Sequence, residues 1–266
     1  MSATPQLTRT AKTLALLLAT FLATEAARSY LSKNATAAAL IAAVGAEWAC
    51  GAMGVAWSDP HADPPTARVV TRRALRGVGI GAAACALTAA VLMLGFGARL
   101  SRATPAVGEL LITLVVTLMV AVRHELIAHG LLLRALGDAP RSLRMIACAA
   151  LSYAFVVGTG IGPRDALYAI PLGACTGVLW MCDRGAFAAV GFHATWAFVW
   201  AGVLHGALLD LRAPQESPWT GRGSLSMGGV AVIALAVTAA VVARFGPRIF
   251  AVTPASLEKR DAARVD

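Results

Sequence analysis

Five ionisable side chains lie in or directly beside one apolar run of the sequence, Arg123-His124-Glu125-Leu126-Ile127-Ala128-His129-Gly130-Leu131-Leu132-Leu133-Arg134. Carboxylate and imidazole groups are the side chains that most often move protons in hydrolytic enzymes. Inside a bilayer an ionisable side chain costs about 3 kcal/mol or more, so it is usually kept for a function. If the chain spans a membrane, this stretch is therefore the first candidate for chemistry.

The spacing of the histidines decides which chemistry the stretch permits. His124 and His129 are five residues apart, about 140° around an α-helix, so we expect them to face different directions. The metalloprotease pattern His-Glu-x-x-His needs histidines four residues apart and is not matched. Glu125 and His129 share a face, and His193 would complete a two-histidine, one-carboxylate set. The sequence thus permits a divalent metal such as zinc at Glu125, His129 and His193 but does not require one.

The composition is that of an integral membrane protein. Of the 266 residues, 58% are hydrophobic and 14% are charged, whereas a soluble domain has roughly 25% charged residues. The mean hydropathy is +0.70. Apolar runs near the ~20 residues needed to cross ~30 Å of hydrocarbon recur along the chain. We predict an all-α, polytopic helical bundle with eight spans near 13–31, 37–57, 74–98, 107–136, 144–161, 165–182, 186–210 and 226–244.

The charges of the connecting segments predict the orientation of the bundle. With eight spans both termini share one side, and most of the Lys and Arg residues outside the spans lie on that side. The positive-inside rule makes this side cytoplasmic. The net charge of +9 then reflects topology and contact with anionic lipid, and it does not indicate nucleic-acid binding. We expect cytoplasmic segments at 1–12 and 245–266 around a membrane domain at 13–244 of a multi-pass cell-membrane protein.

Two side chains on different spans are predicted to lie at the same depth. If Glu109 marks the outer interface, Glu125 lies about 24 Å further along its helix, in the inner part of the membrane. The seventh span runs outward from Asp183, which places His193 about 12 Å from the inner surface. Glu125 and His193 are therefore expected to share one site.

These residues resemble the motifs of the CPBP intramembrane proteases, the family that includes CAAX-prenyl proteases and bacteriocin-processing and self-immunity proteins. The family pattern is Glu-Glu-x-x-x-Arg-Gly before a leucine-rich stretch, then Phe-x-x-x-His, then His-x-x-x-Asn or Asp. The resembling segments are 124–136, 151–159 and 173–197, within a core of about 107–203. The resemblance implies a membrane-embedded peptidase, and an eight-span bundle suits the family.

The polar positions of the motifs are partly substituted. His124 stands where the family has its first Glu, which the resemblance makes the water activator, and His129 stands where it has Arg. Thr159 takes the place of the second-motif His, about 23 Å from the cytoplasmic end of its span, and Ala197 takes the place of the final Asn. Of the family's polar set, Glu125 and His193 are kept.

Two functions follow from this pattern. The resemblance implies an endopeptidase that cleaves membrane proteins or peptides, with Glu125 as base for a water and His124, His193 or His129 assisting. The alternative, which the substitutions suggest, is an inactive relative that serves as a membrane scaffold or immunity protein, in which Glu125 and His129 form a structural i,i+4 pair. A small-solute transporter is a third class, for which the sequence offers few broken helices.

Overall fold

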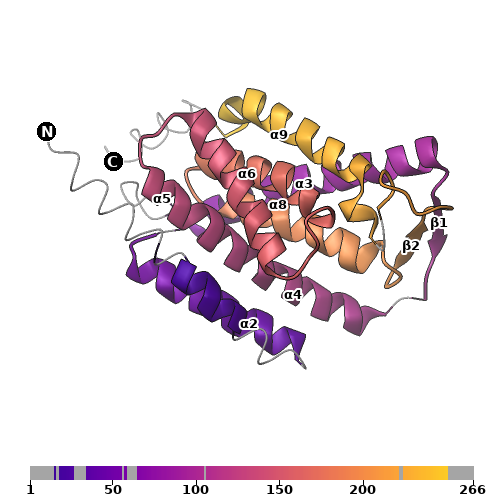
Figure 1. Ribbon diagram of the computed structural model, residues 1–266, viewed down its shortest axis with the longest axis horizontal. Helices are drawn as coiled ribbons and strands as arrows, with labels where there is room; N and C mark the ends of the chain where they lie inside the picture. The colour runs from indigo at the N-terminus through magenta and orange to yellow at the C-terminus, as the bar shows by residue number, and fades with distance from the viewer. Residues whose placement is uncertain are drawn as a thin grey trace, which may run out of the picture.

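The computed structural model describes residues 15, 18–26, 34–55, 57–58, 65–104, 106–221 and 224–250. Within these residues the chain forms a helical bundle with one small two-stranded sheet at its edge (Figure 1). The predicted segment 1–12, and the part of the predicted tail beyond residue 250, lie outside the described residues.

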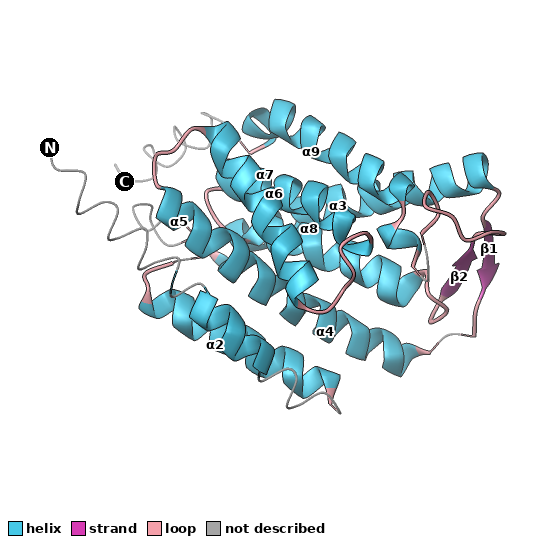
Figure 2. Cartoon of the chain, viewed as in Figure 1, coloured by secondary structure: helices cyan, strands magenta, loops and turns pink. Residues whose placement is uncertain are grey.

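Long α-helices alternate with short π and 3-10 turns. In chain order the elements are α2 (Ala35–Ala52), α3 (Ala67–Phe96), β1 (Arg99–Arg102), α4 (Val107–His124), the π-turn η1 (Glu125–Leu131), α5 (Leu132–Leu136), α6 (Arg141–Gly158), η2 (Asp165–Tyr168), α7 (Ala169–Asp183), α8 (Phe187–Phe198), the π-turn η3 (Val199–Val203), β2 (Leu209–Arg212), η4 (Leu225–Met227) and α9 (Gly229–Ile249). Helices, drawn in cyan, are the predominant secondary structure of the described chain (Figure 2).

Among the described residues, six helices are long and apolar enough to cross a membrane. They coincide with six of the eight predicted spans, and they are Ala35–Ala52, Ala67–Phe96, Val107–Leu136, Arg141–Gly158, Asp165–Asp183 and Gly229–Ile249. Within the predicted first span, 13–31, the structure describes residue 15 and residues 18–26, which are helical. The protein is a polytopic helical membrane protein, and the count of eight spans stays a prediction.

The prediction of a seventh span over 186–210 is wrong at its carboxyl end. The apolar helix is Phe187–Val203, after which the chain turns at Gly206, where φ is +94°, a conformation that glycine adopts without strain. It then enters β2, which pairs antiparallel with β1 from Arg99↔Arg212 to Arg102↔Leu209. The strands lie at the right-hand edge of Figure 1, beyond the start of α4. This sheet ties the segment that leads into α4 to the segment that follows α8.

Small residues allow the helices to approach closely. A side chain at Gly77 of α3 would collide with the backbone of Ala188 on α8, and one at Gly191 of α8 would collide with the backbone of Ala74 on α3. Gly173 and Gly177 of α7 meet α6 in the same way. Membrane helices associate through such close packing because lipid supplies little hydrophobic driving force between them.

The distribution of polarity is that of a protein surrounded by lipid. Leu94 and Trp48 are 89% and 77% exposed on the outer faces of α3 and α2. In contrast, Glu125, His129 and Ser152 are fully buried. Polar groups in the interior of a membrane bundle are costly unless they pair with one another, so this buried set points to the functional centre.

The packing of α3 against α8 can be tested with two glycines on one helix. We expect Gly77→Ala to destabilise the protein by about 1–3 kcal/mol, because the added methyl group must displace the Ala188 backbone. Gly79→Ala meets nothing within 4 Å, so it should be neutral or stabilising by up to about 1 kcal/mol. Thermal unfolding of the two variants in detergent measures the difference, and equal melting temperatures would contradict the packing.

Candidate active site

The helix that carries the ionisable stretch changes geometry where the stretch begins. α4 ends at His124, and Glu125–Leu131 form a π-turn, in which backbone hydrogen bonds join residues five apart. Residues i and i+5 therefore point in similar directions. The rings of His124 and His129 lie on the same side, with centroids 5.7 Å apart. The prediction that they face different directions is wrong, because it assumed regular α-helical geometry.

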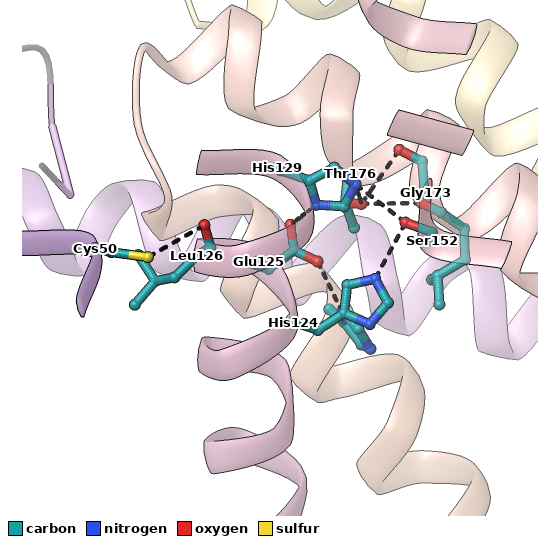
Figure 3. Close-up of polar contacts among 10 residues, drawn as sticks. Cys50, His124, Glu125, Leu126, His129, Ser152, Gly173 and Thr176 are labelled. Carbon is teal, nitrogen blue, oxygen red and sulfur yellow. Dashed lines mark hydrogen bonds and ion pairs between the residues drawn. The ribbon is translucent and has the colours of Figure 1, made fainter. Parts of the chain in front are cut away.

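The carboxylate of Glu125 lies at the centre of the site. His129 Nδ1 donates to Glu125 Oε2 at 2.6 Å, and His193 Nδ1 of α8 donates to Glu125 Oε1 at 2.7 Å. In Figure 3 the carboxylate of Glu125 and the ring of His124 both lie below the ring of His129. Glu125 and His129 are fully buried. The expectation that Glu125 and His193 meet is confirmed.

A serine connects two of the imidazoles. Ser152 Oγ of α6 lies 3.1 Å from His124 Nε2 and 3.2 Å from His129 Nε2. An ionised carboxylate only accepts hydrogen bonds, so the Nδ1 atoms of His129 and His193 carry the protons. Neutral His129 then accepts from the Ser152 hydroxyl, which in turn accepts from His124 Nε2–H. This proton arrangement, assigned from the network, satisfies every one of these contacts.

Hydrogen bonds link Ser152 to His129 and His129 to Glu125. A catalytic nucleophile, its base and an orienting carboxylate are linked in the same order. Ser152 is fully buried, and its Oγ lies so close to α7 that a side chain at Gly173 would collide with it. An acyl group on Ser152 would need that same space. We therefore assign Ser152 a structural role, which we call the serine clamp: its hydroxyl joins α6 to His124 and His129, and it packs against Gly173 of α7.

A buried ion pair lies one residue before the cluster. Arg123 is 4% exposed, its Nη2 donates to Glu25 at 2.5 Å, and its Nε donates to Thr24 at 3.0 Å. The guanidinium also lies 4.8 Å from the ring of Phe155, which contacts the ring of His124 at 4.5 Å. The pair ties residues 18–26 to α4 and packs one wall of the histidine cluster.

The structure brings together all four residues that the sequence proposed as catalytic, His124, Glu125, His129 and His193. Thr159 is not part of this network: it follows the last residue of α6 and donates to the carbonyl of Val156 at 2.7 Å. Ser152, two turns earlier, faces the histidines instead, and Thr176 Oγ1 of α7 lies 3.5 Å from His129 Nε2.

A metal ion needs ligand atoms that converge on one point about 2 Å from each of them. Here the Nδ1 atoms of His129 and His193 are each directed at a separate oxygen of Glu125. Within the described ranges, no group of three or more His, Cys, Asp or Glu side chains is placed to hold a metal. As arranged, the residues do not fit a bound ion, and the zinc set Glu125, His129 and His193 stays a prediction.

Residues 106–199 match the family model described as type II CAAX prenyl endopeptidase Rce1-like. This segment, about a third of the chain, is similar to the Rce1-like family. The match supports the CPBP-type membership that the motifs indicated. No curated protein and no solved structure matches the chain.

The Rce1-like segment extends from the start of α4 into the beginning of η3. It contains every member of the hydrogen-bonded cluster, from Glu125 and the three histidines to Ser152 and Thr176. α2, α3 and α9 lie outside the matched residues and pack around it. The matched part of the chain is thus the part that builds the site.

Loss of the serine clamp should destabilise the bundle. Ser152→Ala leaves Nε2 of His124 and of His129 buried without their closest partner, which we expect to cost about 1–3 kcal/mol. Ser142→Ala, at an exposed position of the same helix, should change the stability by less than about 0.5 kcal/mol. Thermal unfolding in detergent measures both variants. A Ser152→Ala protein as stable as the control would show that the hydroxyl does not hold the histidines.

Proposed function

We propose that the protein is an intramembrane endopeptidase that cleaves peptide bonds of membrane-associated substrates with a water activated by Glu125 and His193. The observation that carries the proposal is the 2.7 Å hydrogen bond between His193 Nδ1 and a buried carboxylate, inside the Rce1-like segment. A carboxylate at Nδ1 fixes the imidazole tautomer and leaves Nε2 as a proton acceptor.

His193 is the histidine of the cluster best placed to meet a water. Its side chain is 8% exposed, whereas His129 is fully buried. Among the described residues its Nε2 has no hydrogen-bond partner, unlike that of His129 or His124. In the proposed reaction Nε2 takes a proton from water as the water oxygen attacks the peptide carbonyl carbon.

The remaining groups have separate tasks. Glu125 stabilises the imidazolium that forms on His193, and His129 holds the second oxygen of Glu125. His124 donates its Nε2–H to Ser152, and its ring lies edge-on to that of His193 with centroids 4.8 Å apart, so we assign it the positioning of the His193 ring. The proton on His193 then passes to the departing amide nitrogen as the carbon–nitrogen bond breaks, which yields a carboxylate and an amine.

The family description directs the choice of substrates. It names a CAAX prenyl endopeptidase, so prenylated peptides ending in Cys-aliphatic-aliphatic-X are the first to be tested. In this proposal the protein spans the cell membrane eight times, and both termini and the entrance for substrate lie on the cytoplasmic side.

A non-catalytic membrane scaffold is the second candidate, and one observation favours it. Both oxygens of Glu125 and both ring nitrogens of His129 are paired, and both side chains are fully buried. A network so fully satisfied suits a structural connection between α4, α6 and α8. On this account catalysis is absent and substitutions in the cluster affect stability alone.

Two substitutions separate the candidates. Glu125→Gln cannot accept from both histidines, and His193→Ala removes the base, so each should lower the cleavage of a prenylated peptide by about 10²- to 10⁴-fold. Full-length protein in detergent or vesicles is assayed by mass spectrometry of the released peptide. His205→Ala, at an exposed position away from the cluster, is the matched control and should cleave normally.

The stability of each variant is measured alongside activity. Loss of cleavage with a melting temperature close to that of the parent supports the peptidase. A parent protein that cleaves none of a broad panel of prenylated and unmodified membrane peptides contradicts it, as does normal cleavage by Glu125→Gln, and either result favours the scaffold.

A further inference from the structure

A cavity of about 330 Å³ lies on the side of η1 away from the sheet. It is lined by residues that follow α2, by η1 and α5, by α6 and by the end of α7. Among the described residues that line it, the charged side chains are Arg134, Arg144 and Arg184, and none is a carboxylate. The other polar side chains in its lining are Ser58 and Trp180. Three guanidinium groups, with no acidic partner in the part of the wall that the structure describes, form a site for an anion.

The wall of this cavity is built by specific backbone contacts. Arg134 Nη1 donates to the carbonyl of Gly54 at 2.5 Å, which fixes one guanidinium to the loop after α2. Ser58 pairs with Gly185 as an isolated bridge, and Gly185 packs so tightly against Trp57 that a side chain there would collide with its carbonyl oxygen. These contacts hold the loop after α2 against the end of α7.

Arg184 occupies this wall in a strained conformation. Its φ is +52°, the only positive φ of a residue other than glycine among the described residues. Left-handed backbone costs a larger side chain of this kind about 1 kcal/mol or more. Arg184 is the C-cap of α7, and this left-handed residue ends the helix and places the Arg184 side chain at the cavity.

Arg144 supplies the observation that points to a ligand. Its Nε is buried and finds no hydrogen-bond acceptor among the described residues. A buried, unpaired donor on a charged side chain costs more than about 1–3 kcal/mol. An anion in the cavity would give this nitrogen the acceptor that the protein does not provide.

We propose that this cavity binds the phosphate group of an anionic phospholipid headgroup. The cavity lies at the end of the bundle where Arg134, Arg141, Arg144 and Arg184 gather, which the positive-inside rule assigns to the cytoplasm. Basic pockets between helices on that side are suited to lipid headgroups. Guanidinium groups bind phosphate oxygens through paired hydrogen bonds. The site is separate from the proposed catalysis, although Gly130, the neighbour of His129, contributes to its wall.

The test measures lipid binding by the full-length protein in detergent. Native mass spectrometry with phosphatidylglycerol, and with phosphatidylcholine of the same acyl chains, reports affinity for the anionic headgroup. Arg144→Gln and Arg184→Gln should each weaken phosphatidylglycerol binding by about fivefold. Arg141 lies at the same end of α6 but does not line the cavity. Arg141→Gln removes the same charge, and the affinity of this variant for phosphatidylglycerol should be unchanged.

Three results would overturn the proposal. Equal loss of binding in Arg141→Gln and Arg144→Gln would show general attraction to a basic surface. Equal affinity for phosphatidylglycerol and phosphatidylcholine would show that the charge of the headgroup does not determine binding. Binding of inorganic phosphate at millimolar concentration, without measurable binding of phosphatidylglycerol, would assign the cavity to a soluble phosphate.

Discussion

A buried carboxylate must find its hydrogen-bond donors within the protein, and in this bundle Glu125 finds them on two elements that are distant in sequence. Taking an ion out of water costs several kcal/mol, which only close and well-directed donors offset. His129 is brought near by the helix itself, but His193 must come from α8. The helices and the small sheet therefore have to hold α4 and α8 in fixed register.

The π-turn brings His124 and His129 to the same side of the helix. A regular α-helix would separate His124 from His129 by about 140°, whereas the π-turn lets both rings reach Ser152. π-turns occur often at functional sites, where a widened turn re-aims side chains. Sequence periodicity predicted the helix but not this turn, because helical periodicity is read from apolar residues and the apolar pattern continues through Gly130 and Leu131.

The predictions that the structure confirms rest on the hydropathy and the length of the apolar segments. Six spans and the shared depth of Glu125 and His193 came from apolar runs and the rise per residue, both of which the bilayer constrains. Ser152 was missed because a single serine in an apolar helix has no distinctive spacing. Its role depends on Gly173, which lets α6 and α7 approach. The pairing of Arg123 with Glu25 and the two strands also depend on tertiary contact, which single-sequence patterns do not contain.

The central claim is that Glu125 accepts a hydrogen bond from Nδ1 of both His129 and His193. Nitrogen-15 NMR of histidine-labelled protein, with single His variants for assignment, reports which ring nitrogen carries the proton, and it needs no substrate. The account predicts protonated Nδ1 atoms on His129 and His193, and a changed signal from both in Glu125→Gln. Unprotonated Nδ1 atoms on both residues, or signals that Glu125→Gln leaves unchanged, would contradict it.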